Sequence, residues 1–314
     1  MTRKRLLVLS LGPPLLIGGA YTLSQPWGER TSVAAGVQGP TSPTRDPEDR
    51  EPSPGTTRET LSAAAALRGK LPSAFETIVR PPFVLAGDLS EAELDRLYRD
   101  HVQPVTEALW RAYFDQRPNR TVSIIALSNE ATFREVARTL DGYETSAYAG
   151  YTQRGAMRIV VNLETGTGTL AHELAHVLAV FDFPGMPEWF DEGLAALHEE
   201  SQFSADRLTL EGTSNWRCQL LRDALRSGEI PSLADVLQSR SIRGDSERLN
   251  YAVVRSVCLY LQERGVLSHY YRKLRAAAAT DRTGVATLCE LLGATSLEQV
   301  DEEFQSWIGG GPES

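Results

Sequence analysis

The sequence predicts an α+β fold in which an N-terminal α/β half is followed by a C-terminal all-helical half. Two observations lead to this prediction. Strand and helix patterns alternate over residues 83–182, and only helical patterns recur after Pro187. The 314 residues, of which 41% are hydrophobic and 23% charged, are enough to bury a sizeable core. We therefore expect the α/β half at residues 71–181 and the helical half at residues 182–314.

The first 70 residues differ in composition from a globular domain. MTRKR precedes an apolar run from Leu6 to Leu23, and the chain that follows is rich in Pro, Gly, Ser, Thr and mixed charge. A basic start before an apolar run is typical of an export signal or a membrane anchor. We expect residues 1–24 to be a signal peptide or an uncleaved signal anchor and residues 25–70 to be a disordered linker. The protein would then be exported, and either anchored in the cytoplasmic membrane or released as a secreted or periplasmic protein.

Strands and helices are expected in turn in the α/β half. The apolar segments FVLAGDL, TVSIIAL and MRIVVNL predict strands at 83–89, 121–127 and 157–163. A helix is expected from Ser90 to Phe114, because Ser90 can cap it and Glu93 follows three residues later. A second helix is expected over NEATFREVARTL. Residues 141–155, rich in Gly, Tyr and Ala, are expected to be irregular.

Helical patterns fill the second half, and no strand is expected after Pro187. The patterns are PEWFDEGLAALHEE, SNWRCQLLRDALRSG, SLADVLQ, RLNYAVVRSVCLYLQERG, SHYYRKLRAAAA, GVATLCELLG and SLEQVDEEFQSWI. Cys218, Cys258 and Cys289 lie in three of them without a Cys-x-x-Cys spacing, so buried thiols are the default interpretation. Export would allow one disulfide, and the sequence does not choose the pair.

The junction between the halves carries the segment TLAHELAHVLA, a helical pattern expected to begin near Thr167 or Thr169. Residues four apart on a helix differ by about 40°, so His172 and His176 share a face and can bind one metal ion. Glu173 follows the first histidine, where the general base for a metal-bound water belongs. Two histidines buried for purely structural reasons are the alternative interpretation.

A catalytic zinc ion takes three protein ligands, and three carboxylates compete to be the third. Asp182 lies six residues past the second histidine, but that arrangement needs a glycine where this chain has Ala179. Glu188 lies in the first turn of the next helix, where the helix dipole favours a carboxylate without any metal. Glu192 is followed by Gly193, which would let its helix approach the histidine helix closely. We predict that Glu192 is the third ligand.

HELAH followed by PEWFDEGLA resembles the gluzincin branch of zinc metallopeptidases, in which a glutamate on a following helix completes His-Glu-x-x-His. FVLAGDLSEAELDRLY, MRIVVN, IPSLADVL, NYAVVRSVCLYLQERG and SLEQVDEEFQSWI resemble exported bacterial domains of the peptidase MA-like family, over roughly residues 80–308. The resemblance implies a zincin-like fold with its cleft between the halves. It also implies one Zn²⁺ ion held by His172, His176 and Glu192, with Glu173 as the base.

The implied function is that of an exported or membrane-anchored zinc-dependent peptidase. It would hydrolyse peptide bonds through a zinc-activated water. An endopeptidase is favoured, because the spacing from His176 to Glu192 is shorter than in aminopeptidase N-like enzymes and the exopeptidase motif Gly-Ala-Met-Glu-Asn is missing. The 157–163 strand would lie at the edge of the sheet beside the cleft, where an extended peptide can add as a further strand.

Several further side chains are candidates for roles around the zinc ion. By the resemblance, Tyr251 is the candidate donor to the oxyanion, and Tyr260 and His269 are weaker candidates. Asp191 can orient a histidine ligand, although a solvated charge would explain it equally well. His198, at the end of its helix, is expected to face solvent and has no assigned role.

The alternative function is a catalytically silent, zinc-stabilised interaction domain at the cell envelope. The presence of Glu173 argues against it, because a structural zinc site needs no base. Beyond residue 60 the chain carries 25 basic and 35 acidic side chains, so no nucleic acid partner is expected. The expected partners are a peptide or protein substrate and, through an uncleaved N-terminal segment, a membrane. The oligomeric state stays open.

Overall fold

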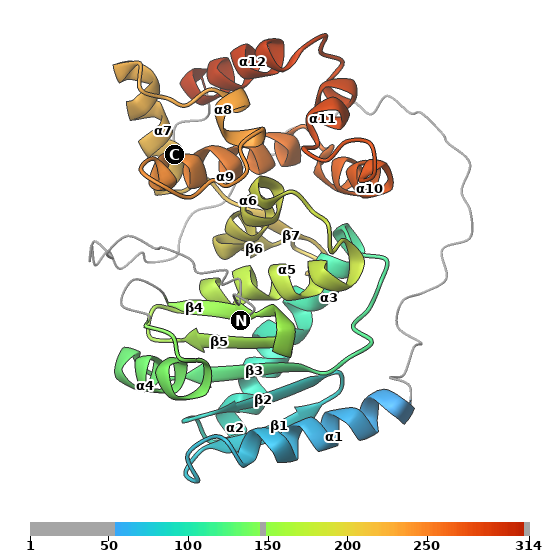
Figure 1. Cartoon of the computed structure of the whole chain (residues 1–314), viewed down its shortest axis with the longest axis vertical. Coiled ribbons are helices and arrows are strands. Elements are labelled where there is room, and N and C mark those ends of the chain that lie inside the picture. The colour runs from blue at the N-terminus through green and yellow to red at the C-terminus, as the bar shows by residue number, and fades with distance from the viewer. Residues whose placement is uncertain (1–53, 145–148, 311–314) are drawn as a thin grey trace, which may run out of the picture.

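The computed structural model describes residues 54–144 and 149–310, and over these residues the fold is α+β, as predicted (Figure 1). A five-stranded sheet with its covering helices occupies one end of the molecule, and helices dominate the other end. The expected signal segment at 1–24 and residues 25–53 of the expected linker lie outside the described residues. Within the described residues no helix is long and apolar enough to cross a membrane.

The sheet has parallel central strands and antiparallel edges. Its strands, in spatial order, are β1 (Glu76–Arg80), β2 (Phe83–Gly87), β3 (Val122–Leu127), β5 (Arg158–Asn162) and β4 (Gly150–Gln153). β2, β3 and β5 pair in parallel, whereas β1 and β4 pair antiparallel with their neighbours. All three predicted strands are present. β2 and β3 are buried along nearly their whole length because helices cover both faces of the sheet.

The edge of the sheet differs from the prediction. The segment expected at the edge forms β5, which lies inside the sheet, and the edge strand is β4, in a stretch predicted to be irregular. β4 has four residues and begins with a glycine, so it lacks the longer alternating pattern that marks a strand. A Cβ atom at Gly150 would lie 2.6 Å from Thr169 Cγ2. The glycine therefore lets β4 pack directly against the helix that begins beside Thr169.

One face of the sheet is covered by α4 (Glu130–Val136), which continues into a π-helical turn, η3 (Ala137–Asp141), and by α1 (Pro54–Arg68). The linker prediction is wrong for α1, because Ala64 and Leu67 of this helix are buried against Val84 of β2. The run AAAAL favours a helix. The helix was not predicted because the residues before this run are rich in Pro, Ser and Thr, a composition typical of a linker.

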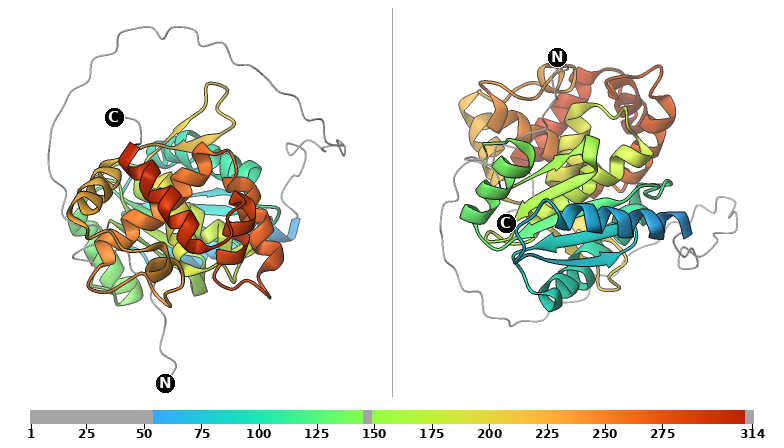
Figure 2. Two further views of the ribbon diagram at one scale, coloured as in Figure 1. Left: turned by 90° about the horizontal axis from the view of Figure 1, so that it is seen from above. Right: turned by 60° about the horizontal axis from the view of Figure 1, so that its bottom comes forward.

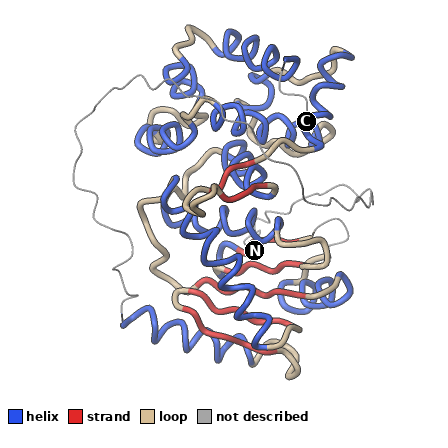
Figure 3. Tube along the Cα trace, turned by 180° about the vertical axis from the view of Figure 1, so that it is seen from behind, coloured by secondary structure: helices blue, strands red, loops and turns tan. Residues whose placement is uncertain are grey.

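The opposite face carries the predicted long helix, which crosses the sheet (Figure 3). It consists of α2 (Glu91–Leu97), a π-helical turn η2 (Tyr98–Val102) and α3 (Gln103–Ala112). The predicted cap is confirmed, because Ser90 Oγ accepts a hydrogen bond from the Glu93 N–H and the Glu93 carboxylate accepts one from the Ser90 N–H. The π-helical turn was not predicted. It ends two residues before Pro104, which has no backbone N–H to donate.

The motif helix is α5 (Gly168–Asp182), which begins after Thr167 and ends before Phe183, as predicted. Thr167 occupies the N-cap position but makes no side-chain cap hydrogen bond. The next helix, α6 (Glu188–Glu199), follows Pro187 directly. α5 lies between the sheet and α6, and α6 lies between α5 and α9 of the helical half (Figure 1). The two motif helices therefore form the junction between the halves.

Six further helices complete the second half: α7 (Trp216–Ser227), α8 (Leu233–Leu237), α9 (Glu247–Glu263), α10 (Leu267–Ala277), α11 (Val285–Leu292) and α12 (Leu297–Gly310). A hairpin of β6 (Ser201–Phe203) and β7 (Leu210–Gly212) follows α6 and projects from the molecule (Figure 2). The prediction of no strand after Pro187 is therefore wrong. Each of these strands has three residues, too few to show a two-residue periodicity in the sequence.

One hydrophobic core runs through both halves. It extends from Leu85 and Ile124 on the sheet through Leu174 of α5 to Val254 of α9 and Phe304 of α12. α9 is buried continuously over residues 251–261 and lies at the centre of the helical half. The two predicted halves are thus distinct in secondary structure but packed around shared side chains.

Candidate metal centre

His172 and His176 of α5 and Glu192 of α6 lie together, as predicted, and could hold a metal ion. Their three candidate ligand atoms all lie within 4.8 Å of one another. The Nε2 atoms of the two histidines are 3.0 Å apart, and Glu192 Oε2 is 3.7 Å from His172 Nε2 and 3.5 Å from His176 Nε2. All three side chains are buried. The sequence thus identified the three side chains that the fold brings together.

Gly193 packs α6 against α9, and not against the histidine helix α5 as the sequence suggested. Gly193 was expected to allow close approach to the histidine helix, but it faces α9 instead. A Cβ atom at Gly193 would lie 2.6 Å from the Val254 carbonyl oxygen and 2.9 Å from Cys258 Sγ. Because consecutive helical residues point about 100° apart, Glu192 faces the histidines while Gly193 faces the helical half. Close packing of α6 on α9 therefore sets the position of Glu192.

Asp191 orients one of the histidines. Its Oδ1 lies 2.8 Å from His176 Nδ1, and its Oδ2 forms an ion pair with Arg154. With Nδ1–H donating to Asp191, the Nε2 lone pair of His176 faces the cluster, which is the tautomer a metal ligand requires. Burial lowers the pKa of His176, but the carboxylates of Asp191 and Glu192 outweigh burial and raise it. Burial and the neighbouring His176 hold the pKa of His172 well below its usual value.

The carboxylate of Glu192 supports a cation at this place. Its Oε1 accepts a hydrogen bond from Arg243 at 3.1 Å, whereas Oε2 is buried and has no hydrogen-bond partner in the described part of the chain. Buried polar atoms are nearly always paired. An unpaired carboxylate oxygen that faces two imidazole nitrogens fits a metal ion as the missing partner.

The two rival carboxylates have other partners. Glu188 accepts a hydrogen bond from Ser241 Oγ at 3.0 Å and lies 3.7 Å from Arg243 Nε. Asp182 accepts hydrogen bonds of 2.8 Å from the backbone N–H groups of residues 115 and 116 and from the hydroxyl of Tyr271, and it pairs with Arg275. Neither carboxylate belongs to the cluster, so the choice of Glu192 over both agrees with the geometry.

Glu173 is buried beside the cluster and has one free oxygen. Thr152 Oγ1 donates a hydrogen bond of 2.6 Å to Oε2, while Oε1 has no hydrogen-bond partner in residues 54–144 and 149–310. Burial raises the pKa of Glu173 to about 7, against the opposing effects of His176 and Thr152. A carboxylate with such a pKa can accept and return a proton near neutral pH.

Of the three candidate oxyanion donors, only Tyr251 lies near the cluster. Burial and the neighbouring Glu192 carboxylate raise its pKa, so the hydroxyl stays protonated, and its oxygen is buried without a hydrogen-bond partner among the described residues. Tyr260 instead packs against Phe304 of α12. His269 is exposed on α10.

His198 differs from the expectation of a solvent-facing group. It is buried, and its Nε2 lies 3.1 Å from the hydroxyl of Tyr113. Burial lowers the pKa of His198 to about 3, so the ring is neutral at physiological pH. It packs edge-on against the Tyr113 ring and does not belong to the metal cluster.

Three contacts of the site were not identified from the sequence: those of Thr152, Arg154 and Arg243. Thr152 and Arg154 lie in or next to β4, and because that strand was not predicted, neither residue had a predicted place. Arg243 lies in the loop before α9, far from the motif in sequence. No local pattern marks any of the three.

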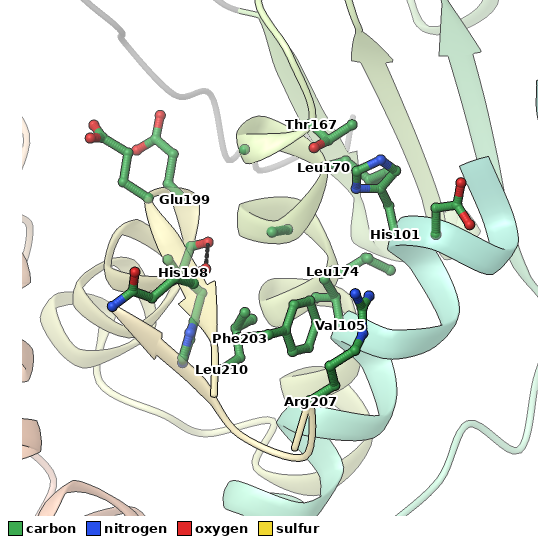
Figure 4. Close-up of a pocket in the computed structure, with 16 residues that line it drawn as sticks. His101, Val105, Thr167, Leu170, Leu174, His198, Glu199, Phe203, Arg207 and Leu210 are labelled. Atoms are coloured by element: carbon green, nitrogen blue, oxygen red, sulfur yellow. Dashed lines mark hydrogen bonds between the residues drawn. The ribbon is translucent and has the colours of Figure 1, made fainter. Parts of the chain in front are cut away.

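A cavity of about 540 Å³ lies between α5, the helix that carries His101 and the β6–β7 hairpin (Figure 4). Leu170 and Leu174 of α5, His101 and the hairpin residues Phe203 and Arg207 line it. None of the cluster residues does. Its other lining residues include the acidic Asp100, Glu199 and Glu200. This mixture of opposite charges and apolar walls points to no single class of ligand, and we assign it none.

Comparison with models of known protein families and with curated proteins finds no match to this chain. The chemistry of the site is therefore inferred from its side chains.

Proposed function

We propose that this protein is a zinc-dependent peptidase with a zincin-like fold, and more specifically an endopeptidase. The observation that carries the proposal is the free Oε1 of Glu173 beside the buried cluster of His172, His176 and Glu192. A structural metal site needs no such base. The similarity of HELAH and PEWFDEGLA to gluzincins supports the same function.

Zinc is the metal that this donor set favours. Two imidazoles and one carboxylate form the ligand set of many catalytic zinc sites, which keep a fourth position open, whereas structural sites usually have four protein ligands. When bound, zinc supplies Lewis acidity toward a carbonyl and a water molecule. His172, His176 and Glu192 would hold the ion.

Each of three side chains around the cluster would have its own role in peptide hydrolysis. Glu173 accepts a proton at Oε1 from the attacking water and returns it to the leaving amine. Tyr251 donates its hydroxyl proton in a hydrogen bond to the carbonyl oxygen as negative charge develops there. Asp191 keeps His176 in the tautomer that presents Nε2.

The substrate would bind along β4. This strand pairs with β5 on one side and has no strand partner on its other side within the described residues. An extended peptide can add to such an edge through main-chain hydrogen bonds, which suits a peptidase that acts within a chain. Export, with or without retention of an N-terminal anchor, remains part of the proposal because MTRKR precedes the apolar run at Leu6–Leu23.

The test compares the zinc-loaded full-length protein with its Glu173→Gln variant on a mixed peptide library, with cleavage read by mass spectrometry. The substitution removes the base and leaves the three proposed ligands in place. We expect the parent to cut internal peptide bonds and the variant to lose these cuts. Equal zinc binding and equal thermal unfolding would show that the variant is intact.

Two outcomes would contradict the proposal. Cuts that persist at the parental rate in the Glu173→Gln variant would remove Glu173 as the base. If folded, zinc-loaded parent protein cut nothing in the library or in unfolded protein substrates, the catalytically silent, zinc-stabilised interaction domain would be favoured instead.

A further inference from the structure

Thr152 of β4 and Arg154, which directly follows the strand, contact two different members of the site. Thr152 Oγ1 donates a hydrogen bond of 2.6 Å to Glu173 Oε2. Arg154, the first residue of the 3₁₀ turn η4 (Arg154–Ala156), forms an ion pair with Asp191. One short segment of the edge strand therefore reaches both the proposed base and the carboxylate behind a ligand.

The contact of Thr152 determines which oxygen of Glu173 is free. Thr152 is buried, and its hydroxyl occupies Oε2, so Oε1 is left without a partner among the described residues. A carboxylate held at one oxygen loses rotational freedom about its last bond, and its other oxygen keeps a fixed direction. A side chain of the same shape without the hydroxyl would leave both oxygens of Glu173 free to turn.

The contact of Arg154 acts through Asp191. Asp191 uses Oδ2 for Arg154 and Oδ1 for His176, so the carboxylate is fixed at both ends. The Arg154 side chain is about one-third exposed (35%), whereas that of Asp191 is almost fully buried (8%). Without Arg154, Asp191 would be a buried carboxylate paired only with an imidazole, and its hold on the ring of His176 would weaken.

The backbone of this segment is itself held in place on two sides. β4 is hydrogen-bonded to β5 along its length, with Thr152 opposite Ile159. On one face of the sheet, Gly150 lets the strand contact α5 so closely that a Cβ atom would lie 3.6 Å from Glu173 Cγ. Thr152 thus projects from a fixed strand, and Arg154 directly follows the last paired residue of that strand.

We propose that the segment from Thr152 to Arg154 is a positioning element for this site. Thr152 fixes the carboxylate of Glu173, and Arg154 fixes Asp191, which orients His176 as a ligand. Neither residue needs to contact the substrate through its side chain. The proposal rests on the proposed function for the role of Glu173, but its metal-binding part does not depend on catalysis.

The test of Thr152 uses two variants of the full-length protein. Thr152→Val keeps the shape and removes the hydroxyl, and Thr152→Ser keeps the hydroxyl. We expect Thr152→Val to lower kcat about 10- to 100-fold with KM and zinc affinity unchanged, and Thr152→Ser to stay within about threefold of the parent. Parental kcat in Thr152→Val, or equal losses in both variants, would overturn the role of Thr152.

A structural measurement decides the same point without a substrate. Crystal structures of the two zinc-loaded variants would show the Glu173 carboxylate in the parental place in Thr152→Ser and displaced in Thr152→Val. An undisplaced carboxylate in Thr152→Val would overturn the proposal even if no peptide were ever cut. Failure of the proposed function and failure of this inference are thereby distinguished.

The test of Arg154 measures zinc affinity by competition with a chelator. Arg154→Met keeps the length of the side chain without its charge, and Arg154→Lys keeps the charge without the fork of N–H donors. We expect zinc to bind about 3- to 10-fold more weakly to Arg154→Met, with partial recovery in Arg154→Lys. Unchanged affinity in a folded Arg154→Met protein would overturn the role of Arg154.

Discussion

Three consecutive residues of α6 perform three different tasks. Asp191 holds His176, Glu192 completes the cluster, and Gly193 faces α9. The helix turns by about 100° per residue, so neighbours in sequence point toward different partners. The identity of each residue in the triplet Asp-Glu-Gly is therefore set by a different neighbour.

The close contact at Gly193 predicts a stability effect. Gly193→Ala would place a methyl group against Val254 and Cys258, so we expect the free energy of unfolding in urea to fall by about 1–3 kcal/mol. Gly185→Ala is the matched control, because nothing lies within 4 Å of a Cβ atom there. Equal stability of the two variants would show that α6 and α9 are not packed as closely as described.

The burial of His198 predicts a dependence of stability on pH. The unfolded chain binds the imidazole proton near pH 6.5, whereas the folded protein, with a pKa of about 3, does not. Between these values the unfolded state holds more protons, so acidification destabilises the fold, by up to about 1.4 kcal/mol per pH unit for this group. His198→Gln should reduce that slope in urea unfolding at a series of pH values. An unchanged slope would mean that His198 is protonated in the folded protein.

The proposed ligands of α5 and the proposed base could be predicted from the sequence because helix periodicity places His172, Glu173 and His176. Glu192 needed the further requirement of a third ligand. Thr152 and Arg154 could not be found, because their contacts with Glu173 and Asp191 arise from a strand that has no pattern of its own. Candidate ligands can be found from residue types and their spacing, whereas the residues that orient them can be found only from the tertiary structure.

The end of α5 joins the sheet half to the helical half through one carboxylate. Asp182 accepts hydrogen bonds from the backbone that follows α3 and pairs with Tyr271 and Arg275 of α10. The Asp182 side chain is fully buried, so the buried Tyr271 hydroxyl has no water to replace it. This network makes Asp182 a structural residue, although its spacing from the histidines resembles that of a ligand.

A substitution separates these two roles of Asp182. Asp182→Ala should lower the free energy of unfolding by about 2–4 kcal/mol, because two backbone N–H groups and the buried Tyr271 hydroxyl lose their acceptor. Zinc stoichiometry should stay at one and the affinity should stay parental. Asp245→Ala, at an exposed position, is the control. Loss of zinc binding without loss of stability would instead identify Asp182 as a ligand.

Among the elements, the sequence predicted those that are long or capped. The boundaries of α5 and the capping box at Ser90 are as expected, because each has a local signal. β4 and the hairpin of β6 and β7 were missed, because strands of three or four residues take their hydrogen bonds from neighbours rather than from a propensity of their own. α1 was missed because its surroundings have the composition of a linker.

Of the two hydrophobic cores in the described residues, the larger runs through both halves, and the candidate metal cluster is buried at their junction. A ligand that binds only the folded state stabilises that state. We therefore expect zinc to raise the free energy of unfolding by about 2.7 kcal/mol when free zinc is 100 times its dissociation constant. Thermal unfolding in zinc buffers measures this effect.

Two variants test whether the zinc-dependent stabilisation arises from binding at the proposed cluster. His172→Ala removes a proposed ligand and should abolish most of the zinc-dependent shift. Glu173→Gln removes no ligand and should keep the shift. A loss of the shift in Glu173→Gln would place Glu173 on the metal and require a different ligand set.

The positions of the site residues along the chain imply an order of assembly. The proposed ligands lie within 21 consecutive residues, on two sequential helices, whereas Thr152, Arg154 and Arg243 come from segments outside that stretch. Local contacts form sooner than distant ones during folding. The contact of Thr152 with Glu173 spans 21 positions, about as many as separate the proposed ligands, whereas those of Arg154 with Asp191 and of Arg243 with Glu192 span 37 and 51. We therefore expect the two arginine contacts to form last. A chain that folds in this order would form the proposed metal cluster before Arg154 and Arg243 fix the carboxylates of Asp191 and Glu192.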